Sequence, residues 1–394
     1  MLYLNYIVWD PQPEIFNLGG WEMRWYGLLF ALGFLISQQI MFYIYRKEGK
    51  PERDVEALTF FMVIATILGA RLGHVLFYEP DKYLSRPLEI LKIWEGGLAS
   101  HGAAIGILLA IYLYVNYLIR IDFGTFEVKK RKRPGQNYMW VVDRLVIVVA
   151  FTGALIRLGN FINSEIVGEE TSADYGVVFA RDAEAVLQIY GQGAVEDVEA
   201  RKIPEAEGLD YPMELEVQFA RGISEEVATK IIEESFATAF LQSERLQADV
   251  RLPATAATGA PEAPSALTIP EYRLEQERGI VTATILAEGI PRHPAQLYES
   301  ISSFLIFLLL FFIWNRKKAQ TPPGLIFGIF LIVLFGLRFV YEFFKENQVA
   351  FEDQLPLNMG QILSIPLVLA GIIILFRSFK QKKEKEEPLT TSKP

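Results

Sequence analysis

The sequence predicts an all-α polytopic membrane protein with seven transmembrane helices and a small α+β extracytoplasmic insert between the fourth and fifth helices. Hydrophobic residues make up 51% of the 394 residues and charged residues only 22%, whereas an ordinary soluble domain is less apolar and more charged. Seven segments are long and apolar enough to span a bilayer, which takes about 20 residues per helix. The charged residues lie mainly between these segments, in four basic stretches and one acidic block.

The seven predicted spans follow one another with few charged residues inside them. The fourth span is the least apolar, because it carries Asp143, Arg144, Arg157 and Asn160. No charged start, short apolar core and cleavage site precede the first span, so we expect no removable signal peptide. The spans lie at residues 25–45, 57–78, 97–119, 141–162, 297–314, 323–344 and 360–376.

Four basic stretches set the predicted orientation. Residues 46–54, 120–140 and 315–322 and the C-terminal tail are rich in Lys and Arg, and such segments stay on the cytoplasmic side. They alternate with the remaining loops as seven crossings require. The N-terminus and the acidic block therefore lie outside, and the C-terminus is cytoplasmic.

The acidic block predicts a folded insert. Residues 163–297 hold 10 Lys or Arg and 25 Asp or Glu, against 28 and 22 in the rest of the chain. The block is too long for a plain loop. We expect short strands at Tyr175–Ala180 and Leu187–Tyr190, a helix capped by Ser224 that runs to about Leu246, and a linker at Arg251–Ala266. The predicted domains are 1–163 with the first four spans, the insert at 164–291, 292–378 with the last three spans, and a charged cytoplasmic tail at 379–394.

The cysteine and histidine content excludes several kinds of site. The chain has no Cys and three His residues. Disulfides, thiolate metal sites and a cysteine nucleophile are therefore excluded, and a multi-histidine metal site is barely possible. We expect no metal, no organic cofactor and no nucleic-acid partner.

Every predicted span places polar residues near its outer end, whereas the inner halves hold few. Ionisable residues inside a span are costly and usually functional. The pattern predicts one polar cavity that opens toward the outer leaflet, since a transporter needs polar groups near the midplane. The residues are Arg24, Tyr26, Arg71, His74, His101, Arg157, Asn160 and Glu165 in the first four spans, and His293, Gln296, Tyr298, Glu299, Arg338, Tyr341, Glu342, Asn358 and Gln361 in the last three.

Two arginines among these residues suit a phosphate. Arg157 and Asn160 are three residues apart and Arg338 and Glu342 are four apart, so each pair shares a helix face. Arginine binds phosphate bidentately, and phosphate in the outer leaflet belongs to phospholipid headgroups. A simple ion pair is the alternative for Arg338 and Glu342.

His101 starts the third span directly after a glycine-containing stretch. A histidine at such a helix start can act as a general base near neutral pH, and a hydrogen-bonded structural histidine is the alternative. We expect His74 to be structural and His293 to position other groups. Glycines four residues apart, such as Gly69 and Gly73, predict close helix packing.

Three function classes remain open on this evidence: an enzyme, a lipid transporter with a one-sided site, and a receptor whose insert binds a partner. A transporter predicts midplane polar groups or inverted repeats, and neither is visible in the sequence. A receptor does not explain two arginines within the spans.

Seven stretches resemble the motifs of bacterial prolipoprotein diacylglyceryl transferases, in the family order and across the whole membrane part. The central one is Arg157-Leu-Gly-Asn-Phe-Ile-Asn-Ser-Glu-Ile-Val-Gly168. The others are Trp25-Tyr26-Gly27, Gly69-Ala-Arg-Leu-Gly73, Trp94-Glu-Gly-Gly-Leu-Ala-Ser-His101-Gly, Arg292-His-Pro-Ala-Gln-Leu-Tyr-Glu299, Arg338-Phe-Val-Tyr-Glu-Phe-Phe344 and Met359-Gly-Gln-Ile-Leu-Ser-Ile-Pro366.

The resemblance implies a multi-pass enzyme of the bacterial cytoplasmic (inner) membrane with its site toward the periplasm. Such enzymes move the diacylglyceryl group of phosphatidylglycerol onto the lipobox cysteine of a prolipoprotein signal peptide, which forms a thioether and releases glycerol phosphate. Both substrates arrive within the membrane lipid. The cysteine nucleophile belongs to the substrate, which agrees with a chain that has none.

The resemblance also implies roles for individual residues. His101 resembles the candidate base near the thiol, although it can equally position other groups. Arg157 and Arg338 resemble a phosphate-binding pair, and Glu342 the carboxylate that orients Arg338. The expected lipid shell is Tyr26, Asn160, Asn163 and Glu165, and the expected supporting residues are Gln296, Tyr298, Glu299, Arg71 and Gln361.

Three features depart from the family pattern. Ile156 stands where the family usually has glycine, which changes helix packing there. Leu334 stands where some relatives have a functional tyrosine. The insert is longer than the usual one, and it either guides lipoprotein substrates or is a lineage-specific addition.

Overall fold

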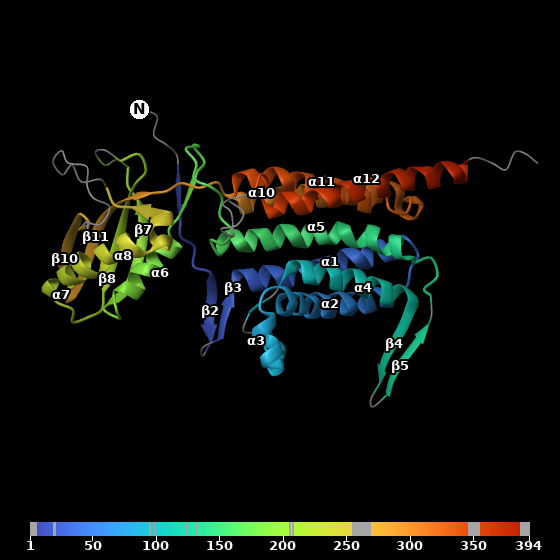
Figure 1. The fold of residues 1–394 in the computed structure, drawn as a ribbon, viewed down its shortest axis with the longest axis horizontal. Helices are drawn as coiled ribbons and strands as arrows, with labels where there is room; N and C mark the ends of the chain where they lie inside the picture. Colours follow the sequence, from blue (N-terminus) through green and yellow to red (C-terminus); the bar gives the residue numbers. More distant parts are fainter. Residues whose placement is uncertain are drawn as a thin grey trace, which may run out of the picture. The chain divides into compact units, whose positions relative to one another are not determined.

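The structure is a computed structural model, and it forms two compact units (Figure 1). Unit 1 comprises Met1–Leu28, Arg157–Glu299 and Tyr341–Leu355, and unit 2 comprises Leu29–Ile156, Ser300–Val340 and Pro356–Pro394. The described residues are 6–18, 21–93, 96–97, 99–122, 125–130, 132–204, 206, 209–253, 269–345 and 355–386.

Long apolar helices form most of unit 2. Among the described residues, six helices are long and apolar enough to cross a membrane, which confirms a helical polytopic membrane protein. The third predicted span is the shorter helix α4, Ser100–Asn116, with 17 residues. The six long helices are α1 (Trp25–Lys47), α2 (Arg53–Phe77), α5 (Tyr138–Ile162), α10 (Ala295–Lys317), α11 (Leu325–Tyr341) and α12 (Met359–Glu386).

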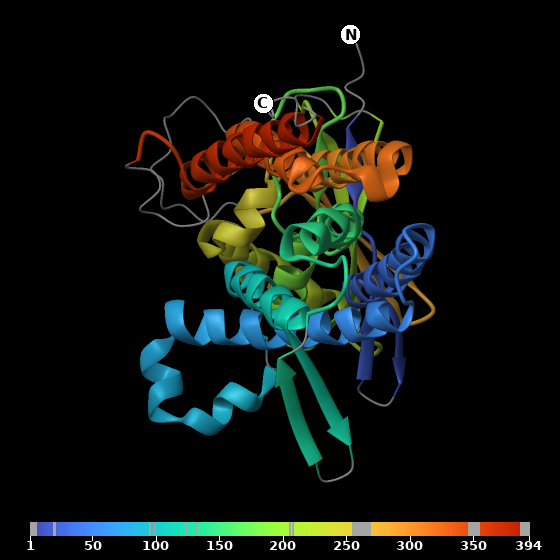
Figure 2. The same ribbon diagram turned by 90° about the vertical axis from the view of Figure 1, so that its right-hand side faces the viewer.

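Helix α5 lies in the middle of the helices of unit 2 (Figure 2). Of its most apolar window, 44% is buried by protein, a larger share than in any other of the six. Protein therefore covers more of α5 than of any of the other five long helices. This position explains how a span with several charged residues is accommodated, because they face other helices.

Glycines let α2 and α4 pack backbone to backbone. A Cβ atom on Gly69 would lie 2.6 Å from the carbonyl oxygen of Gly102, and one on Gly106 would lie 2.7 Å from that of Ala65. No side chain fits at such distances. The predicted close packing through small residues is confirmed for this pair.

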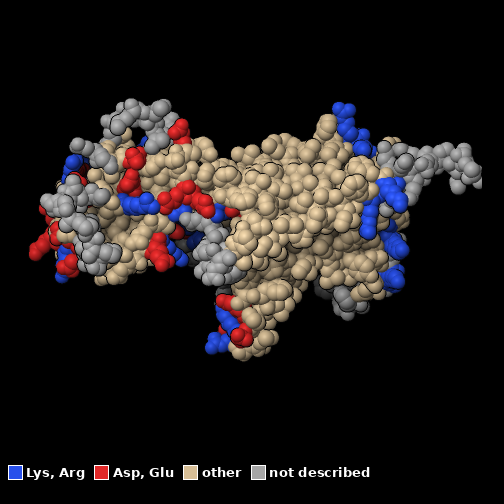
Figure 3. Space-filling view, turned by 45° about the horizontal axis from the view of Figure 1, so that its top comes forward, with Lys and Arg blue, Asp and Glu red and all other residues tan. Residues whose placement is uncertain are grey.

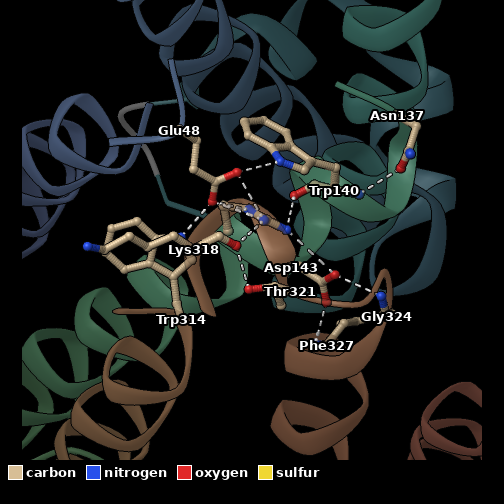
Figure 4. A network of polar contacts seen from close by, with 10 residues as sticks. Glu48, Asn137, Trp140, Asp143, Trp314, Lys318, Thr321, Gly324 and Phe327 are labelled. Carbon is tan, nitrogen blue, oxygen red and sulfur yellow. Dashed lines mark hydrogen bonds and ion pairs between the residues drawn. The ribbon is translucent and has the colours of Figure 1, made fainter. Parts of the chain in front are cut away.

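A buried carboxylate, that of Glu48, joins three helices where the chain leaves α1 (Figure 4). Arg144 of α5 donates from Nε at 3.0 Å and from Nη2 at 2.9 Å to Oε1 of Glu48. The indole nitrogens of Trp140 and Trp314 donate to the same carboxylate at 2.8 and 2.7 Å. The side chains of Arg144 and Glu48 are 1% and 0% exposed. This arrangement fixes α1, α5 and α10 to one another.

Asp143 extends the network to a fourth helix. Its two carboxylate oxygens accept hydrogen bonds from the backbone nitrogens of Gly324, at 2.7 Å, and Phe327, at 2.8 Å. A side chain of α5 therefore caps the N-terminus of α11, whose first amides lack partners within the helix. The two charged residues that the fourth predicted span carries near its inner end, Asp143 and Arg144, are thus buried in a structural network.

Shorter elements connect the long helices of unit 2. The basic stretch predicted as a loop at 120–140 contains a hairpin instead. Figure 3 shows Lys and Arg gathered at one end of the helical surface, next to a wide uncharged band. This distribution agrees with the predicted basic side, and the seven-span orientation remains a prediction. The connecting elements are α3 (Pro80–Ser85), η1 (Pro87–Leu91), β4 (Tyr117–Asp122), β5 (Thr125–Lys130) and η4 (Lys318–Gln320).

The insert in unit 1 is built on a sheet of order β10-β11-β8-β7, with β9 paired to β11. Strand β8 (Pro212–Phe219) alternates buried Met213, Leu215, Val217 and Phe219 with more exposed residues, the period-two pattern of a sheet with one covered face. The other strands are β7 (Val195–Lys202), β9 (Val250–Arg251), β10 (Tyr272–Glu277) and β11 (Ile280–Gly289).

Strands from the N-terminal segment complete unit 1. Strand β1 (Ile7–Trp9) pairs in parallel with β6 (Val177–Phe179), so the start of the chain is part of the same folded body as the insert. A separate hairpin pairs β2 (Glu14–Leu18) with β3 (Trp21–Arg24). The N-terminal segment is thus not an independent arm.

The helices of the insert correct two predictions. Val177–Phe179 is a strand as expected, but Leu187–Tyr190 ends helix α6 (Arg181–Tyr190), because its apolar residues pack at helical spacing. Ser224 caps α7 by accepting from the Val227 nitrogen, yet the helix stops at Ser243. Most of the predicted linker falls at 254–268, outside the described residues. The later helices are α7 (Glu225–Lys230), η3 (Ile231–Phe236), α8 (Ala237–Gln242) and α9 (Glu244–Asp249).

Two carboxyl groups, Asp10 and Glu184, hydrogen-bond to each other in unit 1. Glu184 is 9% exposed and also accepts from the Ala200 nitrogen at 3.0 Å. Burial and the hydrogen bond to Asp10 raise the pKa of Glu184 from 4.5 to about 9, and burial raises the pKa of Asp10. A shared proton therefore links the N-terminal segment to α6.

Replacing Glu48 with Leu should destabilise unit 2 by about 3–5 kcal/mol, because Arg144 and two indole N–H groups lose their buried acceptor. A thermal melt in detergent measures this. Arg46→Ala is the matched control, since Arg46 and Glu52 form an exposed ion pair and its loss should leave the melting temperature unchanged. Equal melting temperatures for both variants would contradict the structural role of Glu48.

The stability of unit 1 should fall as the pH rises from about 4.5 to about 9. In this window folded Glu184 keeps a proton that the unfolded chain releases, so the folded state binds more protons and stability decreases with pH. Glu184→Gln cannot release this proton, and its melting temperature should vary less with pH. Glu275→Gln, at an exposed position of β10, is the control. The same pH slope in wild type and Glu184→Gln would refute the shared proton.

Candidate active site

The end of α5 forms the centre of the candidate site in unit 1. The carboxylate of Glu165 accepts hydrogen bonds from the amide nitrogens of Asn160, at 3.0 Å, and Asn163, at 3.2 Å. The Glu165 backbone nitrogen donates to the Asn160 carbonyl at 2.9 Å. Both asparagines are buried, with 5% and 7% exposure. The three residues that the sequence predicted as a lipid shell are therefore brought together.

The loop after α5 is held in a strained conformation. Ser164 and Ile166 have φ angles of 54° and 58°, a left-handed conformation that is unfavourable for a β-branched residue. Contacts from other elements impose it. Gln296 of α10 donates to the Glu165 carbonyl at 2.7 Å, and Arg181 of α6 donates to the Asn163 carbonyl at 2.6 Å. The predicted supporting residue Gln296 thus holds this loop.

Three chain segments converge on Gly168. Its nitrogen donates to the His293 carbonyl at 3.0 Å, and it bridges to Lys345. A Cβ atom here would lie 2.5 Å from the His293 oxygen and 2.6 Å from the Phe344 oxygen. Only glycine allows the last residue of the central motif to touch both other motifs.

Arg157 is anchored on one edge of its guanidinium. Nε lies 2.6 Å from Oε2 of Glu299, and Nη1 donates to Oδ1 of Asn160 at 3.3 Å. The side chain is 28% exposed. Among the residues that the structure describes, Nη2 forms no hydrogen bond. Arg157 is thus oriented by protein while part of its donor edge stays available for an anion.

A buried lysine that the sequence analysis did not single out joins this group. Lys345 is 6% exposed and contacts Oε1 of Glu299, and it lies 3.4 Å from Oε1 of Glu342. Its position shortly after an apolar helix and three residues after Glu342 was the available signal. These three side chains and Arg157 form a row of four alternating charges, in the order Arg157, Glu299, Lys345, Glu342.

Two further predicted residues lie beside the loop in unit 1. Tyr26 packs against Gly159, where a Cβ atom would be 3.1 Å from the Tyr26 Cα. The hydroxyl of Tyr298 lies 3.0 Å from Nδ1 of His293. Burial lowers the pKa of His293, which favours the neutral imidazole. The expected positioning role of His293 agrees with this contact and with its carbonyl bond to Gly168.

In unit 2, His101 is the second residue of α4 and is exposed. Its ring lies against those of Phe77 and Tyr78, with centroid distances of 5.3 and 5.7 Å. The His101 imidazole is therefore accessible at the start of α4. Trp94, Glu95 and Leu98 of its motif lie outside the described residues.

Arg71 fixes the segment that precedes α4. It is 2% exposed and donates to the carbonyls of Ile90 at 2.9 Å, Glu89 at 2.6 Å and Gly96 at 2.6 Å. Gly97, with φ of 71°, leaves no room for a side chain beside Arg71. Arg71 therefore supports the loop before His101 through backbone contacts.

The remaining predicted residues of unit 2 are Arg338 and Gln361. Arg338 is exposed in the last turn of α11. Gln361 and Asn358 form a reciprocal cap at the start of α12: Asn358 Oδ1 accepts from the Gln361 nitrogen at 2.9 Å, and Gln361 Oε1 accepts from the Asn358 nitrogen at 3.2 Å. This is the geometry of a capping box. Gln361 thus contacts Asn358 and caps the start of α12.

Gly168→Ala should destabilise the junction of the three segments by about 1–3 kcal/mol, because backbone oxygens occupy the space of the new methyl group. Hydrogen exchange of the amides of Gly168 and Glu169, which bond to His293 and Phe344, should accelerate. Gly153→Ala, where no atom lies within 4 Å of the Cβ position, is the control. Unchanged exchange in Gly168→Ala would disprove the tight junction.

Comparisons with known proteins place these features in a family. The family model described as prolipoprotein diacylglyceryl transferase matches residues 13–377. The chain is 34% identical over 376 residues to the phosphatidylglycerol–prolipoprotein diacylglyceryl transferase of Tolumonas auensis, which covers 95% of this chain and 99% of the relative. The protein of the same name from Chloroherpeton thalassium is 33% identical over 96% of both chains, and that of Bacteroides fragilis is 29% identical over 96% of this chain and 98% of the relative.

These matches establish the family. They cover nearly all of this chain and of the relatives. The motifs around Arg157, His293 and Arg338 all fall within the matched residues. The chain therefore belongs to the prolipoprotein diacylglyceryl transferase family, and it is a multi-pass membrane transferase of bacterial lipoprotein biosynthesis.

Proposed function

We propose that this chain transfers the diacylglyceryl group of phosphatidylglycerol to the lipobox cysteine of prolipoprotein signal peptides, at the periplasmic side of the bacterial cytoplasmic membrane. The family supports the reaction class. The observation that carries the lipid site is the geometry of Arg157, which is fixed through Nε and Nη1 and retains Nη2 for an anion. A guanidinium held in this way matches a phosphodiester.

The reaction is a displacement at the glyceryl carbon that bears the phosphate. The cysteine sulfur forms a bond to this carbon while the carbon–oxygen bond breaks, and glycerol phosphate leaves with the electron pair. Negative charge grows on the phosphate oxygens. Arg157 and Arg338 are proposed to stabilise this charge, since donors that are oriented in advance act most strongly where charge develops.

The thiol proton requires an acceptor, because the thiolate is the nucleophile. His101 is the proposed base, and its exposed ring at the start of α4 supports this role. The alternative is that His101 only positions the substrates. Glu342 is proposed to orient Arg338, and Tyr26, Asn160, Asn163 and Glu165 to surround the lipid headgroup.

The predicted supporting residues are proposed to hold the site residues and loops in position. Gln296 holds the loop of the central motif. Glu299 holds Arg157. Tyr298 contacts His293. Arg71 holds the loop before α4, and Gln361 caps α12.

The wild-type protein in detergent should convert phosphatidylglycerol and a lipobox peptide into a diacylglyceryl peptide, detected by mass spectrometry. A peptide with Cys→Ser should give no adduct, because the serine hydroxyl is a far weaker nucleophile at neutral pH. No adduct from folded protein with several lipid donors would instead favour lipid transport or binding.

Arg157→Ala should lower the rate of transfer by about 100-fold or more, because one charge-stabilising donor is lost at the phosphate. Arg201→Ala is the control: Arg201 forms exposed ion pairs on the insert sheet and its loss should leave the rate unchanged. A rate close to wild type for Arg157→Ala, in protein that melts normally, would reject the assigned phosphate site.

A further inference from the structure

Lys345 is a buried cation in unit 1 for which the proposed chemistry has no task. It is 6% exposed and follows the short helix η5 (Glu342–Phe344). Its backbone bridges to Gly168, so its position is tied to the central motif. A buried ammonium group is costly unless it is paired. Its partners therefore indicate what it does.

Both partners of Lys345 are carboxylates of the candidate site. Its Nζ contacts Oε1 of Glu299 and lies 3.4 Å from Oε1 of Glu342. The other oxygen of Glu299, Oε2, lies 2.6 Å from Nε of Arg157. Glu299 thus divides its two oxygens between two cations. The side chains of Lys345, Glu299 and Glu342 are 6%, 11% and 12% exposed.

The way Glu299 divides its oxygens between Arg157 and Lys345 determines which nitrogens of Arg157 contact protein. A carboxylate with both oxygens available prefers the bidentate geometry, in which two adjacent guanidinium nitrogens donate in parallel. Such a pair would engage Nη2 of Arg157 together with Nε. Because Lys345 occupies Oε1, Glu299 takes Nε alone, and Nη2 remains available for a ligand.

The charges lead to the same conclusion. Glu299 and Glu342 balance Arg157 and Lys345, so the row is neutral when it is complete. Without Lys345, Arg157 would be the one cation left in this row beside two buried carboxylates, of which Glu299 contacts it. Removal of one member of a buried ion pair leaves an uncompensated charge, which neighbouring groups then satisfy. Arg157 would be drawn toward the carboxylates and away from a phosphate.

We propose that Lys345 is a positioning residue for diacylglyceryl transfer: it holds one oxygen of Glu299, so that Arg157 keeps a donor edge for the phosphate of the lipid. This inference rests on the proposed function. Lys345 itself touches no reacting atom in this scheme and acts through Glu299.

The test compares Lys345→Met and Lys345→Arg in the full-length protein, with phosphatidylglycerol and a lipobox peptide. Lys345→Met should reduce the transfer rate about 10- to 100-fold, as expected for a displaced catalytic group, and raise the KM for the lipid but not that for the peptide. Lys345→Arg should retain the rate within about threefold, because it keeps the charge at this position. Lys202→Met is the control, since Lys202 contacts a backbone carbonyl and a tyrosine ring in unit 1, and its rate should equal wild type.

A double variant tests whether Lys345 acts through Glu299. Glu299→Gln removes the charge that Lys345 neutralises, so Glu299→Gln combined with Lys345→Met should be no slower than Glu299→Gln alone. The double variant also carries the test if Lys345→Met does not fold, because it leaves only one carboxylate in the row. Thermal melts identify any such variant.

Three results would overturn the inference. Wild-type activity in folded Lys345→Met would mean that Lys345 is dispensable. Equal losses in Lys345→Met and Lys345→Arg would mean that the amine itself takes part in the reaction. Multiplied losses in the double variant would mean that Lys345 does not act through Glu299. Failure of the proposed function is distinguishable, because then the wild-type protein and Lys202→Met also yield no diacylglyceryl peptide.

Discussion

In the described part of unit 2 the buried charges of Glu48, Asp143 and Arg144 are all matched by protein partners, and this requirement organises the helices. The carboxylate of Glu48 receives the guanidinium of Arg144 and two indole N–H groups, and Asp143 next to Arg144 caps α11. Four helices meet at these two carboxylates. Within a bilayer such groups cannot be left to water, so the network has one satisfactory geometry. The apolar packing around α5 is built on it.

The same requirement, met differently, shapes the candidate site in unit 1. Glu165 accepts hydrogen bonds from two asparagine amides and Glu299 contacts two cations, and these contacts keep an arginine and a strained loop oriented. In the Glu48 network the charged groups pair with one another, with indole N–H groups and with backbone groups. In the site, Arg157 is anchored on one side and retains donor capacity on the other. This difference separates a structural ion pair from a binding group.

The insert follows ordinary rules of soluble domains. Its sheet alternates buried and exposed residues, and its core is apolar. The unusual pair of Asp10 and Glu184 links it to the N-terminal segment.

The sequence alone determined the membrane class, the positions of the apolar helices and the motif residues, because hydrophobicity and local spacing act over a few turns of chain. It also brought Asn160, Asn163 and Glu165 into one group, since they are neighbours in sequence. The partner of Arg157, the role of Lys345 and the inner network around Glu48 depend on contacts between residues far apart in the chain, and no local pattern encodes them. The same holds for Leu187–Tyr190, predicted as a strand but folded as the end of α6, because packing in the insert overrides the preference of a short apolar run.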